Sequence, residues 1–507
     1  MSTYIIAIGG TGAKFVEAIV HLSAAGIYLN YSGDRKNPET IKIIFLDPDK
    51  GNGHIASSDK TLKIYQKCTK IIGKDITLPI MQSRIEQFKE GLWSPFVKAR
   101  VRLRDAFKYD EYRDDNPVRH LFEVLYTAEE RDDDLREGFH GRPAVGAAIM
   151  TQLSQDENNR ENWQELIDQI KDDRANTPKV FLCGSIFGGT GASGFPTLGQ
   201  LLLKQLKDFR SQIKLGGVLM LPYFRFRSPR QSDKSQYSHH KEQKIYARSE
   251  DFILNTEAAL RYYATKDLKF NRVYLLGTPE LTEVSNFSTG GSNQRNPPHF
   301  LELYAALALR DFLQLENNDQ QNRVVLTSRH QSNATIWNDI PDRDEVRKKL
   351  TNAARFAFAW NYAIAPDLKY ARDSKRPNAV PWSLKFLNRT ELESLEEQDR
   401  LKEIQDWCQD YLLWLAAIHW SETGVELFNP HSFLENWPNK EDRNELNLKP
   451  YSKEVRDEFT NLLNNSNSTS IYQILEKLPR TAREIQLPNR GVVGLVKALY
   501  RTIEQNP

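Results

Sequence analysis

The sequence predicts an α/β protein with a mostly parallel sheet, because strand-like and helix-like segments alternate along its first half. Helical periodicity is clear at residues 13–25 and 196–209. Two glycine-rich stretches each join a predicted strand to a predicted helix. Short apolar runs have the length of buried strands, and they cover residues 4–8, 41–46, 180–183, 216–221 and 272–276. Together these observations favour a sheet covered by helices on both faces.

The pattern changes after residue 298. The stretch "HFLELYAALALRDFLQL" at 299–315 predicts one long, largely apolar helix. From about residue 366 the chain becomes charged and rich in tryptophan, again with helical patterns. A chain of 507 residues has enough material for two or three domains of ~100–200 residues.

The composition argues against several classes of protein. Hydrophobic residues make up 39% and charged residues 27%, and the formal net charge of +2 argues against a protein that binds nucleic acid by bulk charge. The longest apolar run, at 411–420, has half of the roughly 20 residues that a membrane span needs. A strand begins within three residues of the start, which leaves no room for a signal peptide. Cys68, Cys183 and Cys408 lie far apart without metal-ligand spacing, as in a reduced, cytoplasmic protein.

The two glycine-rich stretches have the composition of phosphate-binding loops. They are "GGTGA" at 9–13 and "FGGTGAS" at 187–193. Glycine lets backbone N–H groups approach an anion, and a helix start adds partial positive charge. A Walker loop is excluded, because Lys14 is followed by Phe15 rather than by serine or threonine. Plain tight turns remain an alternative, but the pair favours one polyphosphate held from two sides.

Further motifs follow in the order of a known family. The second loop resembles the tubulin and FtsZ signature Gly-Gly-Gly-Thr-Gly-Ser/Thr-Gly, and the first is similar to that family's first phosphate loop. Four more stretches resemble the acidic loop, the γ-phosphate loop, the ribose-side loop and the catalytic loop: "FLDPDKGN" at 45–52, "GRPAVGAA" at 141–148, "VLMLPYFRF" at 218–226 and "NDIPD" at 338–342. Over residues 2–365 the chain thus resembles the tubulin/FtsZ-like GTPase superfamily, in particular its bacterial tubulin-like proteins.

The resemblance implies a domain organisation. It predicts a nucleotide-binding domain at 1–298 with an insertion at about 50–137, and a central helix at 299–317. A second, α+β domain would start at 318–365 with the catalytic loop. A mostly helical C-terminal extension would occupy 366–507.

The resemblance also implies a nucleotide site for GTP or GDP, with ATP as an alternative, and Mg²⁺. Asp47 or Asp49 would hold the waters of the Mg²⁺ ion. Phe300 and Tyr304, at the start of the central helix, would contact the base, although packing in the core explains them equally well. The remaining predicted nucleotide-binding residues are Gly9, Gly10, Thr11, Gly12, Ala13, Pro143, Ala144, Gly188, Gly189, Thr190, Gly191, Ala192, Ser193 and Arg227.

The predicted catalytic residues are Asn338, Asp339 and Asp342. By resemblance, they would act on the nucleotide of the next subunit in a head-to-tail polymer. A helix-capping turn is the alternative, because Pro341 and acidic residues precede a predicted helix. The loop lacks one spacer of the family pattern, and Ala144 stands where the family has an acid.

Three functions follow from these motifs. The first is a cytoskeletal GTPase that is activated by its own assembly into filaments. The second is a nucleotide-sensing scaffold that does not hydrolyse nucleotide and recruits a partner protein through its C-terminal region. The third is a Rossmann-type oxidoreductase, which leaves the second glycine loop without a use.

The basic stretch at 225–244 would be a solvated loop or a contact for an acidic partner.

Overall fold

The computed structural model describes residues 2–29, 40–75, 78–94, 101–139, 141–152, 160–226, 249–266, 269–284, 291–293, 295–315, 323–328, 334–374, 380–421, 424–435, 446–463, 469–484 and 490–506. The predicted site residue Arg227 lies outside the described residues, and so does the rest of the basic stretch up to residue 244.

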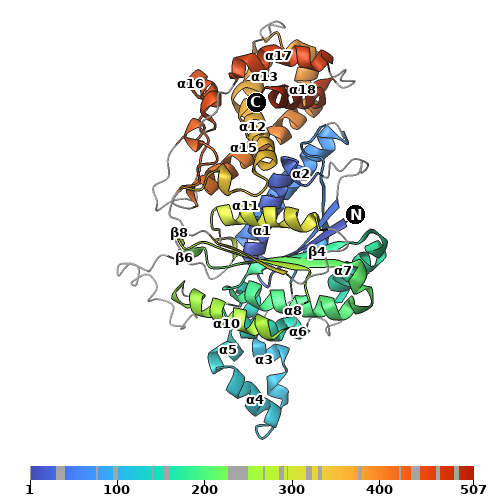
Figure 1. The fold of residues 1–507 in the computed structure, drawn as a ribbon, viewed down its shortest axis with the longest axis vertical. Helices are drawn as coiled ribbons and strands as arrows, with labels where there is room; N and C mark the ends of the chain where they lie inside the picture. Colours follow the sequence, from blue (N-terminus) through green and yellow to red (C-terminus); the bar gives the residue numbers. More distant parts are fainter. Residues whose placement is uncertain are drawn as a thin grey trace.

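The described strands form one seven-stranded parallel sheet in the order β3-β2-β1-β4-β5-β7-β9 (Figure 1). A separate pair, β6 (Phe224–Phe226) and β8 (Thr282–Val284), lies outside it. The α/β class and the parallel sheet are confirmed. The sheet strands are β1 (Ser2–Ile8), β2 (Thr40–Leu46), β3 (Arg84–Trp93), β4 (Lys179–Ser185), β5 (Lys214–Met220), β7 (Arg272–Gly277) and β9 (Arg323–Ser328).

Helices cover both faces of the sheet (Figure 1). The central strands β4 and β5 are buried along their whole length, which explains their nearly continuous apolar sequences. On one face lie α1 (Gly9–Ala24), α2 (Gly53–Ile72) and α11 (Phe300–Leu313). On the other lie α6 (Pro143–Gln152), α7 (Arg160–Asp172), α8 (Gly189–Gln205) and α10 (Phe252–Thr265).

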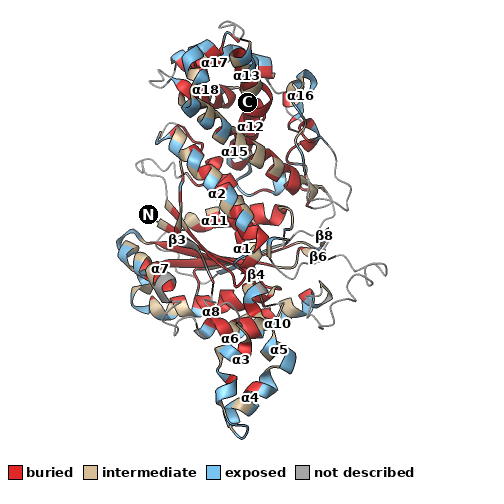
Figure 2. Ribbon diagram, turned by 180° about the vertical axis from the view of Figure 1, so that it is seen from behind, coloured by how far each residue is buried: buried red, intermediate tan, exposed pale blue. Residues whose placement is uncertain are grey.

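Part of the predicted insertion projects from the sheet as a small helical lobe of mostly exposed residues (Figure 2). It contains α3 (Leu103–Ala106), α4 (Pro117–Leu125) and α5 (Ala128–Asp132). The other two elements in the predicted range, α2 and β3, belong to the main layers of the fold.

After α11 the chain returns to the sheet in β9, which pairs with β7. Among the described residues beyond 328 we find isolated bridges and helices but no further sheet, so the expected α+β character of a second domain is not seen there. The domain boundaries themselves stay predictions. The larger helices of this region are α12 (Arg343–Ala359), α13 (Ala365–Asp373), α15 (Leu395–Trp420), α17 (Ile471–Glu484) and α18 (Gly491–Gln505), with a π-helical turn at Trp360–Ile364.

The helical region packs on the sheet layer through a shared core. Buried hydrophobic residues from Tyr4 to Ile503 form one contiguous cluster. Cys68, Cys183 and Cys408 are buried free thiols within it. No helix in the described part of the chain is long and apolar enough to cross a membrane.

Candidate nucleotide site

The two glycine loops follow the adjacent central strands β1 and β4. From β1 the chain continues to β2 on one side, whereas from β4 it continues to β5 on the other side. Such a switch point opens a crevice at the carboxyl ends of the strands, where α/β proteins bind ligands. Ile8 ends β1 and Ser185 ends β4, so both loops begin at this edge.

The two loops are in direct contact. A Cβ atom added to Gly9 would lie 3.4 Å from the Cβ atom of Thr190 and 3.8 Å from the backbone nitrogen of Gly191. Gly9 has a φ angle of +71°, which glycine adopts without strain. The structure therefore brings the two predicted phosphate loops together, although they are separated by about 180 residues in sequence.

Both helices that follow these loops begin without a cap. The N-cap residues are Ile8 for α1 and Gly188 for α8; neither provides a side-chain hydrogen bond, and the first turn of each helix contains no acidic residue. Some other helices have a side-chain cap, for example α2 with Asn52 and α5 with Thr127, whereas others, such as α15 and α18, have none. An uncapped helix start presents free N–H groups and partial positive charge. Two such starts side by side form an environment suited to an anion.

The acidic loop after β2 lies beside the first glycine loop. Asp47 accepts hydrogen bonds from the backbone nitrogen of Asp49 at 2.8 Å and from Asn52 Nδ2 at 3.2 Å. Asp49 accepts from the backbone nitrogens of Gly51 at 2.8 Å and Gly291 at 2.6 Å. Burial raises the pKa of Asp47 to about 8. Both carboxylates thus hold the loop in shape, and each oxygen keeps a lone pair for a further contact.

His54 joins the acidic loop to the first glycine loop. A Cβ atom on Gly10 would lie 2.9 Å from His54 Cδ2, and His54 Nε2 accepts a hydrogen bond from the backbone nitrogen of Asn296 at 3.4 Å. Burial, together with the nearby charges of Lys14 and Arg295, lowers the pKa of His54 to about 3. The imidazole is therefore neutral at physiological pH.

The predicted γ-phosphate loop packs against the second glycine loop. A Cβ atom on Gly189 would lie 3.0 Å from the backbone nitrogen of Gly141. Pro143 and Ala144 begin α6, and Ala144 is exposed. The buried Ser193 hydroxyl donates to the carbonyl oxygen of Gly189 at 2.7 Å, so it is engaged within its own helix.

A buried polar network lies behind the first glycine loop. Lys14 and Glu302 form an ion pair whose side chains are only 5% and 2% exposed. The Tyr223 hydroxyl donates to Glu302 Oε1 at 2.8 Å, and Thr11 hydrogen-bonds to Tyr223. The second Glu302 oxygen accepts from the backbone nitrogen of His299 at 2.9 Å. The network thereby connects the first turn of α1 to the start of α11.

The sequence motifs did not indicate Glu302, His299 or His54 as residues of the site. The only available signal was charge within largely apolar helices, since Lys14 and Glu302 interrupt two such patterns.

The two predicted base contacts, Phe300 and Tyr304, lie at the start of α11, as Glu302 does. Phe300 is buried and Tyr304 half-buried, and their ring centroids are 5.9 Å apart.

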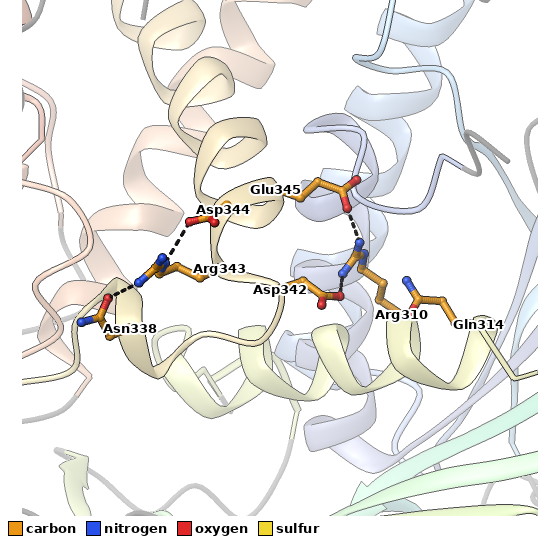
Figure 3. A pocket seen from close by; sticks show the side chains of 7 residues that line it. All are labelled: Arg310, Gln314, Asn338, Asp342, Arg343, Asp344 and Glu345. Atoms are coloured by element: carbon orange, nitrogen blue, oxygen red, sulfur yellow. Dashed lines mark hydrogen bonds and ion pairs between the residues drawn. The ribbon is translucent and has the colours of Figure 1, made fainter. Parts of the chain in front are cut away.

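The predicted catalytic loop lies beside α11, and its Asp342 faces Arg310 near the C-terminal end of that helix (Figure 3). Arg310 follows Phe300 by ten positions, or ~15 Å of helix. Asp342 and Glu345 both form ion pairs with Arg310. A surface pocket of about 660 Å³ opens here, lined by Arg310, Gln314, Asn338, Asp342, Arg343, Asp344 and Glu345.

The three predicted catalytic residues have separate contacts. Asn338 Oδ1 accepts from Arg343 at 2.9 Å, and Asp339 accepts from the backbone nitrogen of Ile336 at 2.9 Å. Asp342 is the N-cap residue of α12 and has a φ angle of +50°. Asn338 and Asp342 line the pocket, whereas Asp339 closes the preceding turn.

No protein-family model matches the sequence, and no curated protein sequence matches it. Among solved structures the chain is similar to CetZ from Methanosaeta thermophila strain DSM 6194, with 12% identity and a TM-score of 0.28 over 63% of this chain and 57% of that chain. It is also similar to CetZ2 from Haloferax volcanii, a GTPγS-bound protofilament, with 14% identity and a TM-score of 0.28 over 62% of this chain and 58% of that chain. Each match spans less than two thirds of the solved chain.

Proposed function

We propose that the chain binds a nucleoside triphosphate with its phosphates between the two glycine loops. The observation that carries this proposal is the meeting of two uncapped helix starts, those of α1 and α8, at the switch point between β1 and β4. Their N–H groups would donate to phosphate oxygens, and the half-buried Thr190 hydroxyl would add a donor at the contact between the loops.

The residues around this site also fit a hydrated Mg²⁺ ion. Asp47 and Asp49 would hold waters of the ion through their remaining lone pairs, since their direct hydrogen bonds already fix the loop. The ion would neutralise part of the phosphate charge. Because burial raises the pKa of Asp47 to about 8, the ion would also favour the ionised form of this side chain, and we expect tight nucleotide binding to require a divalent cation.

The more specific proposal is GTP hydrolysis coupled to head-to-tail self-assembly. It rests on the motif resemblance, with Asn338, Asp339 and Asp342 acting on the nucleotide of the next subunit. Asp342 pairs with Arg310 near the C-terminal end of α11, whereas Lys14, next to the first glycine loop, pairs with Glu302 at its start; this separation supports action in trans. Guanine as the base, with Phe300 and Tyr304 as its contacts, belongs to the same proposal.

A scaffold that binds nucleotide without hydrolysing it is the second candidate. The contacts of the acidic residues favour it: Asp342 is paired with Arg310, and Asp339 is held by the backbone nitrogen of Ile336. In each of these two side chains, one carboxylate oxygen is thus already engaged within the chain. In this case the helical C-terminal region would recruit the partner.

Gly188→Asp is the sharpest test of the nucleotide site. Aspartate is a favoured N-cap residue, so α8 should stay folded while its N–H groups are occupied by a carboxylate. Within the described part of the chain, an added Cβ atom would crowd only the Ser185 hydroxyl, at 2.8 Å, and this group can rotate. We expect the affinity for Mg²⁺–GTP to fall about 100-fold, equivalent to about 2.7 kcal/mol, in calorimetric titrations.

Gly188→Ala is the matched control. It adds the same Cβ atom without the charge, and we expect its nucleotide affinity to stay within a few-fold of the parent. Unchanged affinity in a folded Gly188→Asp protein would exclude the proposed phosphate site. No binding of GTP or ATP to the parent protein would exclude the proposed function altogether.

A further inference from the structure

Arg355, on α12, is a buried cation without a visible partner. Its side chain is only 3% exposed, and its Nε atom has no hydrogen-bond partner. No hydrogen bond or ion pair connects its guanidinium to any residue that the structure describes. Several other poorly exposed arginines pair with a carboxylate: Arg272 with Asp311, Arg310 with Asp342 and Glu345, and Arg456 with Asp367. Arg210 instead donates to carbonyl and amide oxygens.

A buried charge without a counter-charge destabilises the folded state. The desolvation of a charged group costs several kcal/mol, and proteins offset it by pairing the group with an opposite charge. Burial lowers the pKa of Arg355, but a guanidinium stays protonated in proteins. An anion supplied from outside the chain would therefore remove a substantial cost.

A second polar group without a partner lies on the same face of α12. The Thr351 hydroxyl is buried, at 8% exposure, and makes no hydrogen bond. Residues four apart share a helix face, and a long side chain leans towards the N-terminal end of its helix. Arg355 therefore leans over the turn that carries Thr351. The exposed Lys348, three residues before Thr351, continues this face to the surface.

This part of α12 is remote from the glycine loops. The neighbouring Lys349 donates to the carbonyl oxygen of Gly26 at 2.9 Å, just beyond the C-terminal end of α1. Gly9 begins α1 at its other end, and 16 residues of helix span ~24 Å. A ligand at Arg355 would thus bind separately from the proposed nucleotide.

We propose that Arg355 and Thr351 form a binding site for a small oxyanion, a carboxylate or phosphate group, with Lys348 at its entrance. The planar guanidinium can donate two parallel hydrogen bonds to such a group, and the Thr351 hydroxyl can donate a third. The proposal does not depend on nucleotide binding at the glycine loops.

Anion titrations in the Gly188→Asp protein test this site, because that change suppresses anion binding at the glycine loops. We expect inorganic phosphate or acetate, but not chloride, to raise the melting temperature in a saturable way, by about 2 °C. Calorimetry should give one bound anion per chain, and the comparison of phosphate with acetate identifies the preferred group. The absence of any saturable effect from both oxyanions would overturn the proposal.

Arg355→Met in the same background is the decisive variant. It should abolish the response to anions, and in anion-free buffer it should melt no lower than its parent, since it removes an unpaired charge. Arg389→Met, which removes an exposed arginine from α14 (Arg389–Glu393), is the matched control and should respond like the parent. A retained response in Arg355→Met would overturn the site, and so would a melting temperature several degrees lower without anion.

If Arg355→Met does not fold, Arg355→Lys keeps the proposal testable. Lysine retains the charge but lacks the planar fork of donors, so we expect about tenfold weaker oxyanion binding. Unchanged affinity in Arg355→Lys would contradict the proposed recognition by the guanidinium.

Discussion

Lys14 directly follows the first glycine loop, where a lysine side chain could reach a phosphate, yet its ammonium group pairs with Glu302 in the core. This contact, with Tyr223 as a further hydrogen-bond partner of Glu302, fixes the first turn of α1 against the start of α11. A buried ion pair contributes little net stability compared with apolar side chains, but the loss of one partner leaves the other charge uncompensated. The role of Lys14 is therefore structural.

We predict that Glu302→Gln lowers the free energy of unfolding by about 3 kcal/mol, because it leaves the Lys14 ammonium buried without a counter-charge. The double variant with Lys14→Met should recover much of that loss. Urea unfolding of the two single variants and the double variant measures the coupling. Additive losses in the double variant would contradict the pairing.

His21 gives a prediction for the pH dependence of stability. Its ring is fully buried against Tyr411 and Trp414, with Asp410 at 3.7 Å, and burial lowers its pKa from 6.5 to about 4. Below pH 6.5 the unfolded chain binds a proton that the folded chain does not, so the free energy of unfolding should fall as the pH drops towards 4.

His21→Leu should reduce this loss, by up to about 3 kcal/mol between pH 6.5 and 4. His54, whose pKa is also lowered, should account for a further part of the acid sensitivity. Urea unfolding over this pH range measures both contributions. The same pH profile in His21→Leu and the parent would show that the buried ring does not titrate as inferred.

At the level of elements, sequence patterns located the strands that are buried on both faces. Strands β1, β4 and β5 are nearly continuous apolar runs, and the glycine loops mark their carboxyl ends. The apolar runs did not predict strands β3 and β9, which form the two edges of the sheet. Strand β9 exposes Val324 and Leu326. Edge strands lack the two-sided burial that produces a continuous apolar pattern.

The candidate site, too, could be predicted only in part from sequence patterns. The meeting of the two loops follows from strand order, and glycine spacing made it predictable. The pairing of Lys14 with Glu302, and the turn of the Ser193 hydroxyl into its own helix, depend on how helices distant in sequence pack and on local side-chain geometry. A single sequence carries no pattern for either.

At the level of the whole molecule, the first glycine loop is linked to the start of α11 through Lys14 and Glu302, whereas Asp342 pairs with Arg310 near the end of that helix. One chain therefore cannot be expected to bring both to the same nucleotide. If the chain is a GTPase, its site must be completed by a second copy, and turnover must depend on assembly. If it is a scaffold, the two ends can act independently.

We predict that GTP hydrolysis per chain rises with protein concentration, in parallel with light scattering. Asp342→Asn should lower this activity at least about 100-fold while nucleotide affinity stays the same, since asparagine tolerates the positive φ angle of this residue. Asp373→Asn, at the exposed end of α13, is the control and should hydrolyse GTP like the parent. Tight binding without turnover in the parent would instead support the scaffold.

The three native thiols also have a practical consequence. Cys68, Cys183 and Cys408 are all buried, and burial raises the pKa of each thiol, so the folded chain should resist alkylation. A cysteine introduced at an exposed position such as Val124, on α4 of the helical lobe, would then be the single reactive group. The native chain is thus ready for attachment of one fluorophore per molecule, without removal of its own cysteines.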